Sequence, residues 1–205
     1  MRVLSGSARG VPLKTVPDLG TRPILDRLKK SLFSILDAMG LLVDARVADL
    51  YAGTGTLGLE ALSRGAEHCL FVEKRPDGVK LLHENLVKTK LATKAEVRCA
   101  AVGGVLQELA AAGPDQRRFD LILYDPPFAF SRDAESRAAL EAELALAGRL
   151  LYPGHARLVL RCERKAAPPA PAGLAMVRHW ADGPHALAFY QVSETQPARS
   201  PEEKR

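Results

Sequence analysis

Residues 49–58, Asp-Leu-Tyr-Ala-Gly-Thr-Gly-Thr-Leu-Gly, constrain the fold of this chain more than any other stretch. An apolar run ends there and a helical pattern begins directly afterwards, which predicts a strand, a tight turn and a helix. Gly53, Gly55 and Gly58 fit the GxGxxG fingerprint, in which glycines permit positive φ and close approach of the backbone to a ligand. Similar turns also arise for purely structural reasons, and NAD-binding proteins share the pattern. The fingerprint alone therefore leaves the ligand open.

Two acidic residues narrow the choice of ligand. Glu73 ends the next apolar run, where an acid can accept hydrogen bonds from the ribose hydroxyls of a nucleoside. Asp49 precedes Gly53 by four residues, close to where a dinucleotide would place its pyrophosphate, and a carboxylate there would repel phosphate. It suits a ligand that carries an ammonium and a sulfonium, so we predict S-adenosyl-L-methionine as the cofactor. In the alternative interpretation, Asp49 only hydrogen-bonds the glycine turn.

Strand and helix patterns alternate along the chain. Strands are expected at residues 47–50, 69–73, 95–99, 119–125 and 156–162, and a final hairpin at residues 174–179 and 186–192. Helices are expected at residues 21–39, 56–64, 76–91, 103–112 and 133–151. This order predicts an α/β, Rossmann-like fold with a mostly parallel seven-stranded sheet and helices on both faces. Ligands of such sheets bind beyond the carboxyl ends of the strands, where Asp49, Glu73 and Asp125 all fall.

Length and composition fit one main domain with a small appendage. The chain has 205 residues, of which 47% are hydrophobic and 26% charged. We expect a basic β-hairpin arm at residues 1–20, the Rossmann-like domain at residues 21–192 and a disordered tail at residues 193–205. Cys69, Cys99 and Cys162 are predicted to be reduced core residues, and no metal-ligand spacing is present. No apolar run approaches eighteen residues, so we expect a soluble cytoplasmic protein with no membrane partner.

Positive charge is concentrated at the start of the chain. Residues 1–30 hold seven basic and two acidic side chains, whereas the remaining residues balance. Such an arm could be an electrostatic footprint for nucleic acid, although a merely solvated basic segment is also common. The candidate RNA contacts are Arg2, Arg9, Lys14, Arg22 and Arg27. In the first helix the charged residues, Asp26, Lys29 and Lys30 among them, lie off the apolar stripe and are expected to be available to a ligand.

A second motif, Asp125-Pro126-Pro127-Phe128, follows a nearly continuous apolar strand. Two consecutive prolines fix the backbone and remove two donors, so the carbonyl groups can point into a cleft. Asp125 and the Pro126 carbonyl could accept both hydrogens of an exocyclic amine, and Phe128 could stack on the base. The sequence is also compatible with an ordinary turn.

With both motifs in view, the chain resembles the class I S-adenosylmethionine-dependent methyltransferases, and among them the RsmD-type methyltransferases of the guanine N2 amine in 16S ribosomal RNA. The resemblance runs from Arg2 to about Val192. It is carried by Arg-Val-Leu-Ser-Gly at residue 2, Thr-Arg-Pro at residue 21, the run at residues 49–66, Phe-Val-Glu-Lys at residue 71, Asn-Leu at residue 85 and Asp-Pro-Pro-Phe at residue 125.

The resemblance implies a role for each segment. The methionine part of the cofactor would lie on the glycine turn, the ribose on the second strand and the adenine at the end of the third. The implied cofactor contacts are Asp49, Tyr51, Ala52, Gly53, Thr54, Gly55, Gly58, Glu73, Lys74, Ala100 and Ala101. Ala100 stands where the family often has a polar residue that binds the adenine amino group, so a weaker side-chain contact is expected. The guanine would bind residues 125–128, and the arm would hold RNA.

The predicted function is therefore methyl transfer from S-adenosyl-L-methionine to a guanine in 16S rRNA, on a small ribosomal subunit or its assembly intermediate, by a monomer. Alternatives are methylation of amines in DNA or other RNA, an NAD-binding oxidoreductase or sensor, and a non-catalytic RNA-binding module.

Overall fold

Seven strands form one sheet in the order β3-β2-β1-β4-β5-β7-β6. A computed structural model describes residues 1–15, 26–113, 118–127 and 134–193. Strands β3, β2, β1, β4 and β5 are parallel to one another, and β7 is antiparallel to both β5 and β6. The strands are β1 (Arg46–Leu50), β2 (His68–Glu73), β3 (Ala95–Cys99), β4 (Leu121–Tyr124), β5 (Arg157–Glu163), β6 (Leu174–Asp182) and β7 (His185–Val192).

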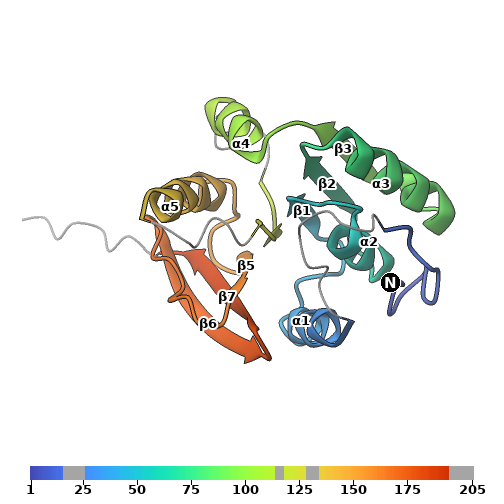
Figure 1. Cartoon of the computed structure of the whole chain (residues 1–205), viewed down its shortest axis with the longest axis horizontal. Coiled ribbons are helices and arrows are strands. Elements are labelled where there is room, and N and C mark those ends of the chain that lie inside the picture. Colours follow the sequence, from blue (N-terminus) through green and yellow to red (C-terminus); the bar gives the residue numbers. More distant parts are fainter. Residues whose placement is uncertain (16–25, 114–117, 128–133, 194–205) are drawn as a thin grey trace, which may run out of the picture.

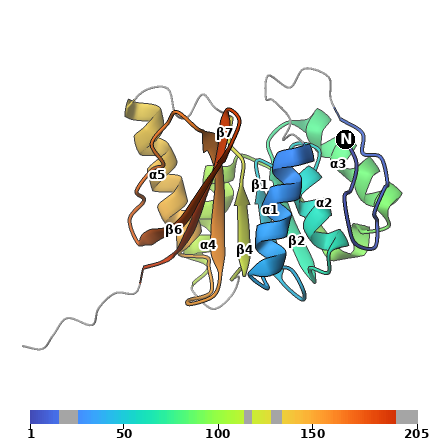
Figure 2. The same ribbon diagram turned by 90° about the horizontal axis from the view of Figure 1, so that it is seen from below.

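Helices cover both faces of this sheet (Figures 1 and 2). They are α1 (Asp26–Ala38), α2 (Thr56–Ser63), α3 (Pro76–Thr89), α4 (Val102–Ala111) and α5 (Ala134–Gly148), with a short 3-10 turn, η1 (Ala92–Lys94). One hydrophobic core lies under α1, α2 and α3, and a second under α4 and α5. The predicted Rossmann-like architecture, with a mostly parallel sheet between two helical layers, is confirmed.

The central strands are buried on both faces, which explains their apolar sequences. β4 is buried along its whole length, and four of the five residues of β1 are buried. Register fixes where the strands end: Leu50 pairs with Val72 on β2 and with Tyr124 on β4, and Tyr124 pairs with Leu160 on β5. The residues that follow these strands are consequently side by side at the carboxyl edge of the sheet.

The C-terminal strands form the predicted hairpin. It turns at Gly183, whose φ is +60°, and Asp182 pairs with His185 across the turn. β6 runs further than expected, to Asp182, and its register shifts between Met176 and Arg178. β7 is inserted between β5 and β6, so its residues reach the interior of the sheet while β6 forms an edge.

The N-terminal arm packs against α2 and does not form two strands. A single antiparallel bridge joins Arg2 to Pro12, and Val3, Ala8 and Leu13 are buried in the core under α1, α2 and α3. The arm approaches α2 very closely, because a Cβ atom at Gly6 would lie 1.7 Å from the Ser63 carbonyl oxygen. The expected boundary near residue 20 lies outside the described residues, as does the expected tail beyond residue 193.

Two of the three cysteines have the predicted environment. Cys69 and Cys162 are buried, whereas Cys99 is exposed, so the prediction that all three are core residues is wrong for Cys99. It ends β3, an edge strand of the sheet in which no residue is fully buried. Across the described ranges, none of the helices combines the length and apolar character needed to cross a membrane.

Candidate active site

The glycine turn connects the end of β1 to the start of α2. Tyr51, Gly53 and Gly55 have positive φ values of 64°, 56° and 82°, so the chain reverses direction within a few residues. A Cβ atom at Gly53 would meet nothing within 4 Å, which leaves the backbone open to a ligand on that side. At Gly58 a Cβ atom would lie 2.3 Å from Cε1 of Phe71. The fingerprint glycines therefore serve two purposes, an open turn and close packing of α2 on β2.

Asp49 is a buried residue of β1 and is tied to α2. Its Oδ2 accepts a hydrogen bond of 2.8 Å from the Gly58 amide. Burial raises the pKa of Asp49 to about 7; the Gly58 hydrogen bond opposes this shift, and the negative charges of Asp125 and Glu73 add to it. A cationic ligand would relieve the repulsion among these three acids. The hydrogen bond to the turn is thus present, and contact of Asp49 with a cofactor ammonium stays a prediction.

Glu73 ends β2 and holds the backbone around the turn. Its two oxygens accept hydrogen bonds from the amides of Gly53 at 2.9 Å and Arg75 at 2.8 Å. An ionised carboxylate offers about four lone-pair sites, so Glu73 can still accept hydrogen bonds from ribose hydroxyls. Gly78 on α3 keeps this corner narrow, since a Cβ atom there would lie 3.2 Å from the Glu73 Cγ. The sequence analysis did not single out Gly78.

The predicted adenine contacts gather on the other side of Glu73, at the end of β3. The Ala100 amide donates a hydrogen bond of 3.1 Å to the Glu73 carbonyl oxygen, which joins the ends of β2 and β3. Ala101 is the exposed N-cap of α4 and has an extended backbone, and Lys74 is also exposed. The structure therefore places these residues beside Glu73, with β1 between them and Asp125. Their contacts with a cofactor stay predictions.

The Asp-Pro-Pro turn follows β4 and lies beside the end of β1. The Asp125 amide donates a hydrogen bond of 3.2 Å to the Leu50 carbonyl oxygen. Pro126 is buried and Pro127 is half-buried. Phe128, the last residue of the predicted motif, lies outside the described residues. The structure thus brings the acid of the second motif to the same edge as Asp49.

Arg161 on β5 is a site residue that the sequence analysis missed. Its Nε donates a hydrogen bond to Oδ1 of Asp125, and the two side chains are only 6% and 15% exposed. Burial raises the pKa of Asp125, while the charge and hydrogen bond of Arg161 and the charge of His185 lower it. One signal was present in the sequence, because Arg161 interrupts the apolar run Leu-Val-Leu-Arg-Cys of β5.

A second missed residue, Glu143 on α5, holds two tyrosines together. Its Oε2 accepts hydrogen bonds from the Tyr51 hydroxyl at 2.7 Å and from the Tyr124 hydroxyl. The two rings meet edge to face, with centroids 5.4 Å apart. Burial raises the pKa of both tyrosines, and the charge of Glu143 adds to the shift. This contact fixes Tyr51, which has left-handed backbone, beside the strand that leads into Asp125.

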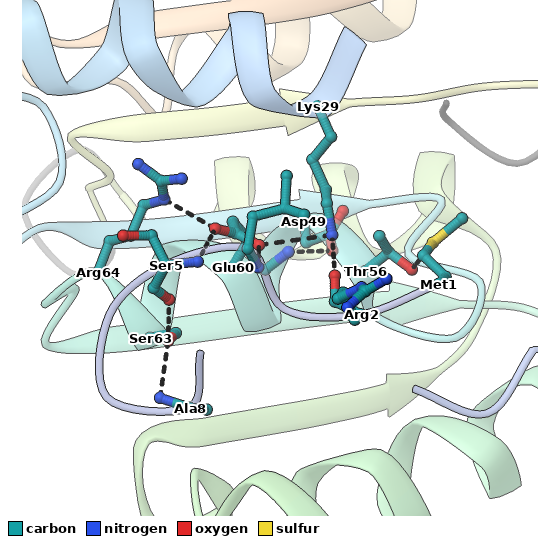
Figure 3. Close-up of polar contacts among 12 residues, drawn as sticks. Met1, Arg2, Ser5, Ala8, Lys29, Asp49, Thr56, Glu60, Ser63 and Arg64 are labelled. Carbon is teal, nitrogen blue, oxygen red and sulfur yellow. Dashed lines mark hydrogen bonds and ion pairs between the residues drawn. The ribbon is translucent and has the colours of Figure 1, made fainter. Parts of the chain in front are cut away.

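The prediction that Lys29 is available to a ligand is wrong. Lys29 is fully buried, and its Nζ donates a hydrogen bond of 2.6 Å to the Arg2 carbonyl oxygen and lies 3.4 Å from Glu60 Oε2 (Figure 3). Glu60 also accepts hydrogen bonds from the amides of Leu4 at 2.7 Å and Ser5 at 3.0 Å. The helical pattern placed Lys29 off the apolar stripe, but the arm covers that face.

The arm is also attached to the glycine turn at two points. Thr56, the first residue of α2, donates a hydrogen bond of 3.0 Å to the sulfur of Met1 (Figure 3). Asn85 on α3 donates to the carbonyl oxygens of Lys14 and Thr54, each at 3.0 Å. Within the turn itself, the Ala52 amide donates a hydrogen bond of 3.0 Å to the Val72 carbonyl oxygen on β2.

The candidate RNA contacts that the structure describes are all exposed, but two of them have acidic partners. Arg2 and Arg9 are exposed on the arm. Lys14 forms an exposed ion pair with Glu84, with Nζ and Oε2 2.7 Å apart, and Arg27 pairs with Asp182. Arg22 lies outside the described residues. Exposed ion pairs are weak, so these basic side chains remain suitable for phosphate contacts.

The fold and the site together define a Rossmann-like protein of the methyltransferase class, for which the sequence predicts S-adenosyl-L-methionine as the cofactor. The residues present fit this cofactor: the backbone at Gly53 is open, and the acids around it match a ligand with cationic groups and ribose hydroxyls. The chain belongs to the family described as Conserved hypothetical protein 95, whose model matches residues 1–191. The family membership predicted from the sequence is confirmed.

Similar proteins carry related names. "Putative rRNA methyltransferase YlbH" of Bacillus subtilis is 40% identical over 129 residues, which cover 62% of this chain and 67% of that protein. "Ribosomal RNA small subunit methyltransferase D" of Haemophilus influenzae is 33% identical over 132 residues, which cover 64% of this chain and 65% of that protein. The aligned segment thus spans about two thirds of these relatives. A solved structure, a hypothetical protein of Thermus thermophilus, is 35% identical with a TM-score of 0.78, and the match covers 94% of this chain and 99% of that one.

Proposed function

We propose that this protein transfers a methyl group from S-adenosyl-L-methionine to the exocyclic N2 amine of a guanine in 16S ribosomal RNA. The observation that carries the proposal is the position of Asp125 and Pro126 beside the glycine turn, at the edge where Asp49 and Glu73 also lie. The names of the relatives from Bacillus subtilis and Haemophilus influenzae support ribosomal RNA as the substrate class.

The chain supplies distinct contacts for the two ends of the cofactor. When bound, S-adenosyl-L-methionine provides an electrophilic methyl group on a cationic sulfur. Asp49 would bind the ammonium of the methionine part, because a buried acid with neighbouring acids gains most from a cation. Glu73 would accept hydrogen bonds from the ribose hydroxyls, and the turn at residues 51–55 would contact the methionine chain. Lys74, Ala100 and Ala101 would border the adenine.

The Asp-Pro-Pro turn would position the guanine amine. Asp125 and the Pro126 carbonyl would accept hydrogen bonds from the two N–H groups of the amine. These bonds would draw the nitrogen lone pair out of conjugation with the ring and aim it at the methyl carbon. The amine nitrogen would bond to the methyl carbon as the carbon–sulfur bond breaks, which would leave a neutral thioether on the donor, and the proton that the amine loses would pass to solvent. Pro127 stiffens the turn, and Phe128 would stack on the base. A guanine inside a duplex would first have to be flipped out.

The exposed arm would hold the RNA backbone through Arg2, Arg9 and Lys14, with Arg22 and Arg27 on the following segment. We propose the small ribosomal subunit or an assembly intermediate as the natural partner, met in the cytoplasm by a monomer.

Product mapping tests this function. The protein is incubated with methyl-labelled cofactor and small subunits from cells that lack the corresponding methylation, and the labelled nucleotide is identified. The proposal predicts N2-methylguanine in 16S rRNA. Label on adenine N6, or preferential labelling of DNA, would contradict it. Calorimetry against S-adenosyl-L-methionine and NAD separates the proposal from an NAD-binding protein.

A further inference from the structure

Arg161, a buried residue of the sheet, contacts Asp125 of the Asp-Pro-Pro turn. Arg161 projects from β5 with its side chain only 6% exposed, and its Nε donates a hydrogen bond to Oδ1 of Asp125. A charged guanidinium in such a place is costly unless it is paired. The surrounding strand is apolar, so packing alone does not explain why arginine stands there.

The hydrogen bond has a defined direction. Arginine Nε belongs to a planar fork, so a bond through it fixes the orientation of the carboxylate as well as its charge. Oδ1 of Asp125 is therefore the oxygen that contacts Arg161 on β5. A carboxylate that is already oriented can accept a hydrogen bond from an amine without reorganising.

Charged groups from three strands act on Asp125. Arg161 on β5 and His185 on β7 favour its ionised form, whereas Asp49 on β1 opposes it. Arg161 adds a hydrogen bond to the carboxylate to its charge. Burial works against ionisation, so the counter-charge decides how much of the carboxylate is ionised near neutral pH.

We propose that Arg161 is a positioning residue for methyl transfer, which acts through Asp125 by orienting its carboxylate and keeping it ionised as the acceptor for the substrate amine. This proposal rests on the proposed function, since it assigns Asp125 to the amine. It predicts that Arg161 affects turnover and its pH dependence and leaves binding of the methyl donor nearly unchanged.

Steady-state kinetics across pH provide the first test, with Arg161→Gln and the matched control Arg157→Gln. Arg157 lies on the same strand, but its Nη1 donates to the backbone carbonyls of Gly154, His155 and Ala156. For Arg161→Gln we expect kcat at pH 7 to fall about 10- to 100-fold. The acid limb of its pH profile should move upward by about one unit or more, because a neighbouring positive charge lowers the pKa of a carboxyl by about 1 to 3 units. Calorimetry should give a donor Kd within about threefold of wild type.

Titration of the carboxyl itself provides a readout that does not depend on catalysis. The carbon-13 signal of the Asp125 carboxyl is assigned by its loss in Asp125→Asn and followed against pH in wild type and Arg161→Gln. The proposal predicts a higher pKa in the variant. If wild type transfers no methyl group to RNA, the proposed function fails, yet this titration still decides whether Arg161 controls Asp125.

A double variant keeps the test decisive if Arg161→Gln alone does not fold. Asp125→Asn/Arg161→Gln removes both charges, so it avoids an unpaired buried carboxylate. It should turn over at the same rate as Asp125→Asn, because the Asp125 carboxylate through which Arg161 is proposed to act is absent from both variants. The proposal would be overturned if Arg161→Gln left the Asp125 pKa and the pH profile unchanged, or if Arg157→Gln shifted them equally. It would also be overturned if the losses of turnover in the two single variants added up in the double variant.

Discussion

Asp49 and Gly58 are joined by a hydrogen bond of 2.8 Å from the Gly58 amide to the Asp49 carboxylate, which ties β1 to α2 across the glycine turn. The acid is buried and the glycine packs against Phe71, so neither residue can be changed without affecting the other. This relationship gives the carboxyl edge of the sheet a fixed acid at the point where the chain reverses direction.

Donor binding should depend on the ionisation of Asp49. Its pKa is raised to about 7, so the fraction that is ionised rises with pH through that value. If the ionised carboxylate binds the cofactor ammonium, the affinity for S-adenosyl-L-methionine should increase as pH rises from about 6 to 8. In Asp49→Asn the affinity should be lower and this pH dependence should vanish. Calorimetry at several pH values measures both, and an unchanged pH dependence in the variant would exclude Asp49 as its source.

The same shift predicts a pH-dependent stability difference. Asp49 binds its proton more tightly in the folded than in the unfolded state, so its contribution is most favourable below the unfolded pKa of 3.8 and is lost as pH rises toward 7. Relative to Asp49→Asn, the wild type should lose up to about 4 kcal/mol of unfolding free energy over that range. Urea unfolding of both proteins at pH 5 and 8 should show about 2 to 3 kcal/mol of this difference. A constant difference would contradict the raised pKa.

Gly58→Ala should destabilise the protein by about 1 to 3 kcal/mol, because the added methyl group overlaps the Phe71 ring and the Cys69 sulfur. Gly104→Ala is the matched control. Gly104 is an exposed residue of α4, and a Cβ atom there meets nothing within 4 Å. This change should stabilise the helix by about 0.5 to 1 kcal/mol. Thermal unfolding checks the two opposite signs.

Replacement of the buried Lys29 should weaken the attachment of the N-terminal arm to the core. Lys29→Ala removes one partner of the buried Glu60 carboxylate, which still pairs with Arg64 at 2.8 Å, so a loss of about 1 to 3 kcal/mol is expected. Lys14→Ala breaks only the exposed pair with Glu84 and should cost less than about 1 kcal/mol. Urea unfolding measures both losses, and limited proteolysis should cut residues 1–15 faster in the first variant alone. Equal effects would show that burial of this pair contributes nothing special.

The arm's role in RNA binding predicts a salt-dependent effect of Arg9. Arg9→Ala should weaken binding of 16S rRNA and reduce the slope of log affinity against log salt by about 1, because one phosphate contact is removed. Arg149→Ala removes an exposed arginine just beyond α5 and serves as the control, with an unchanged slope expected. Filter binding at several salt concentrations distinguishes these outcomes. Identical slopes in the two variants would place the RNA elsewhere.

The sequence was sufficient to predict where the acids gather, because each follows an apolar strand and parallel strands end at one edge. The prediction that Asp49, Glu73 and Asp125 lie at one edge of the sheet agrees with the structure, in which the three acids lie close enough to interact. Arg161 and Glu143 were missed because their importance depends on partners on other strands and helices, which no local pattern identifies.

The error at Lys29 has the same origin. Helical periodicity separates an apolar stripe from the remaining faces, but it carries no information about a distant segment that covers one of those faces. The arm buries Lys29 through Arg2 and Glu60, and this contact is a property of the tertiary fold. The extension of β6 to Asp182 was similarly hidden, because the apolar run at the start of the strand gives way to Arg178 and His179.

The most direct test of the account is to measure donor binding and methyl transfer on the same preparation of Asp125→Ala. We predict that calorimetry gives an affinity for S-adenosyl-L-methionine close to that of wild type, while transfer to under-methylated small subunits falls below detection. Equal loss of binding and transfer, or transfer at the wild-type rate, would contradict the assignment of Asp125 to the guanine amine.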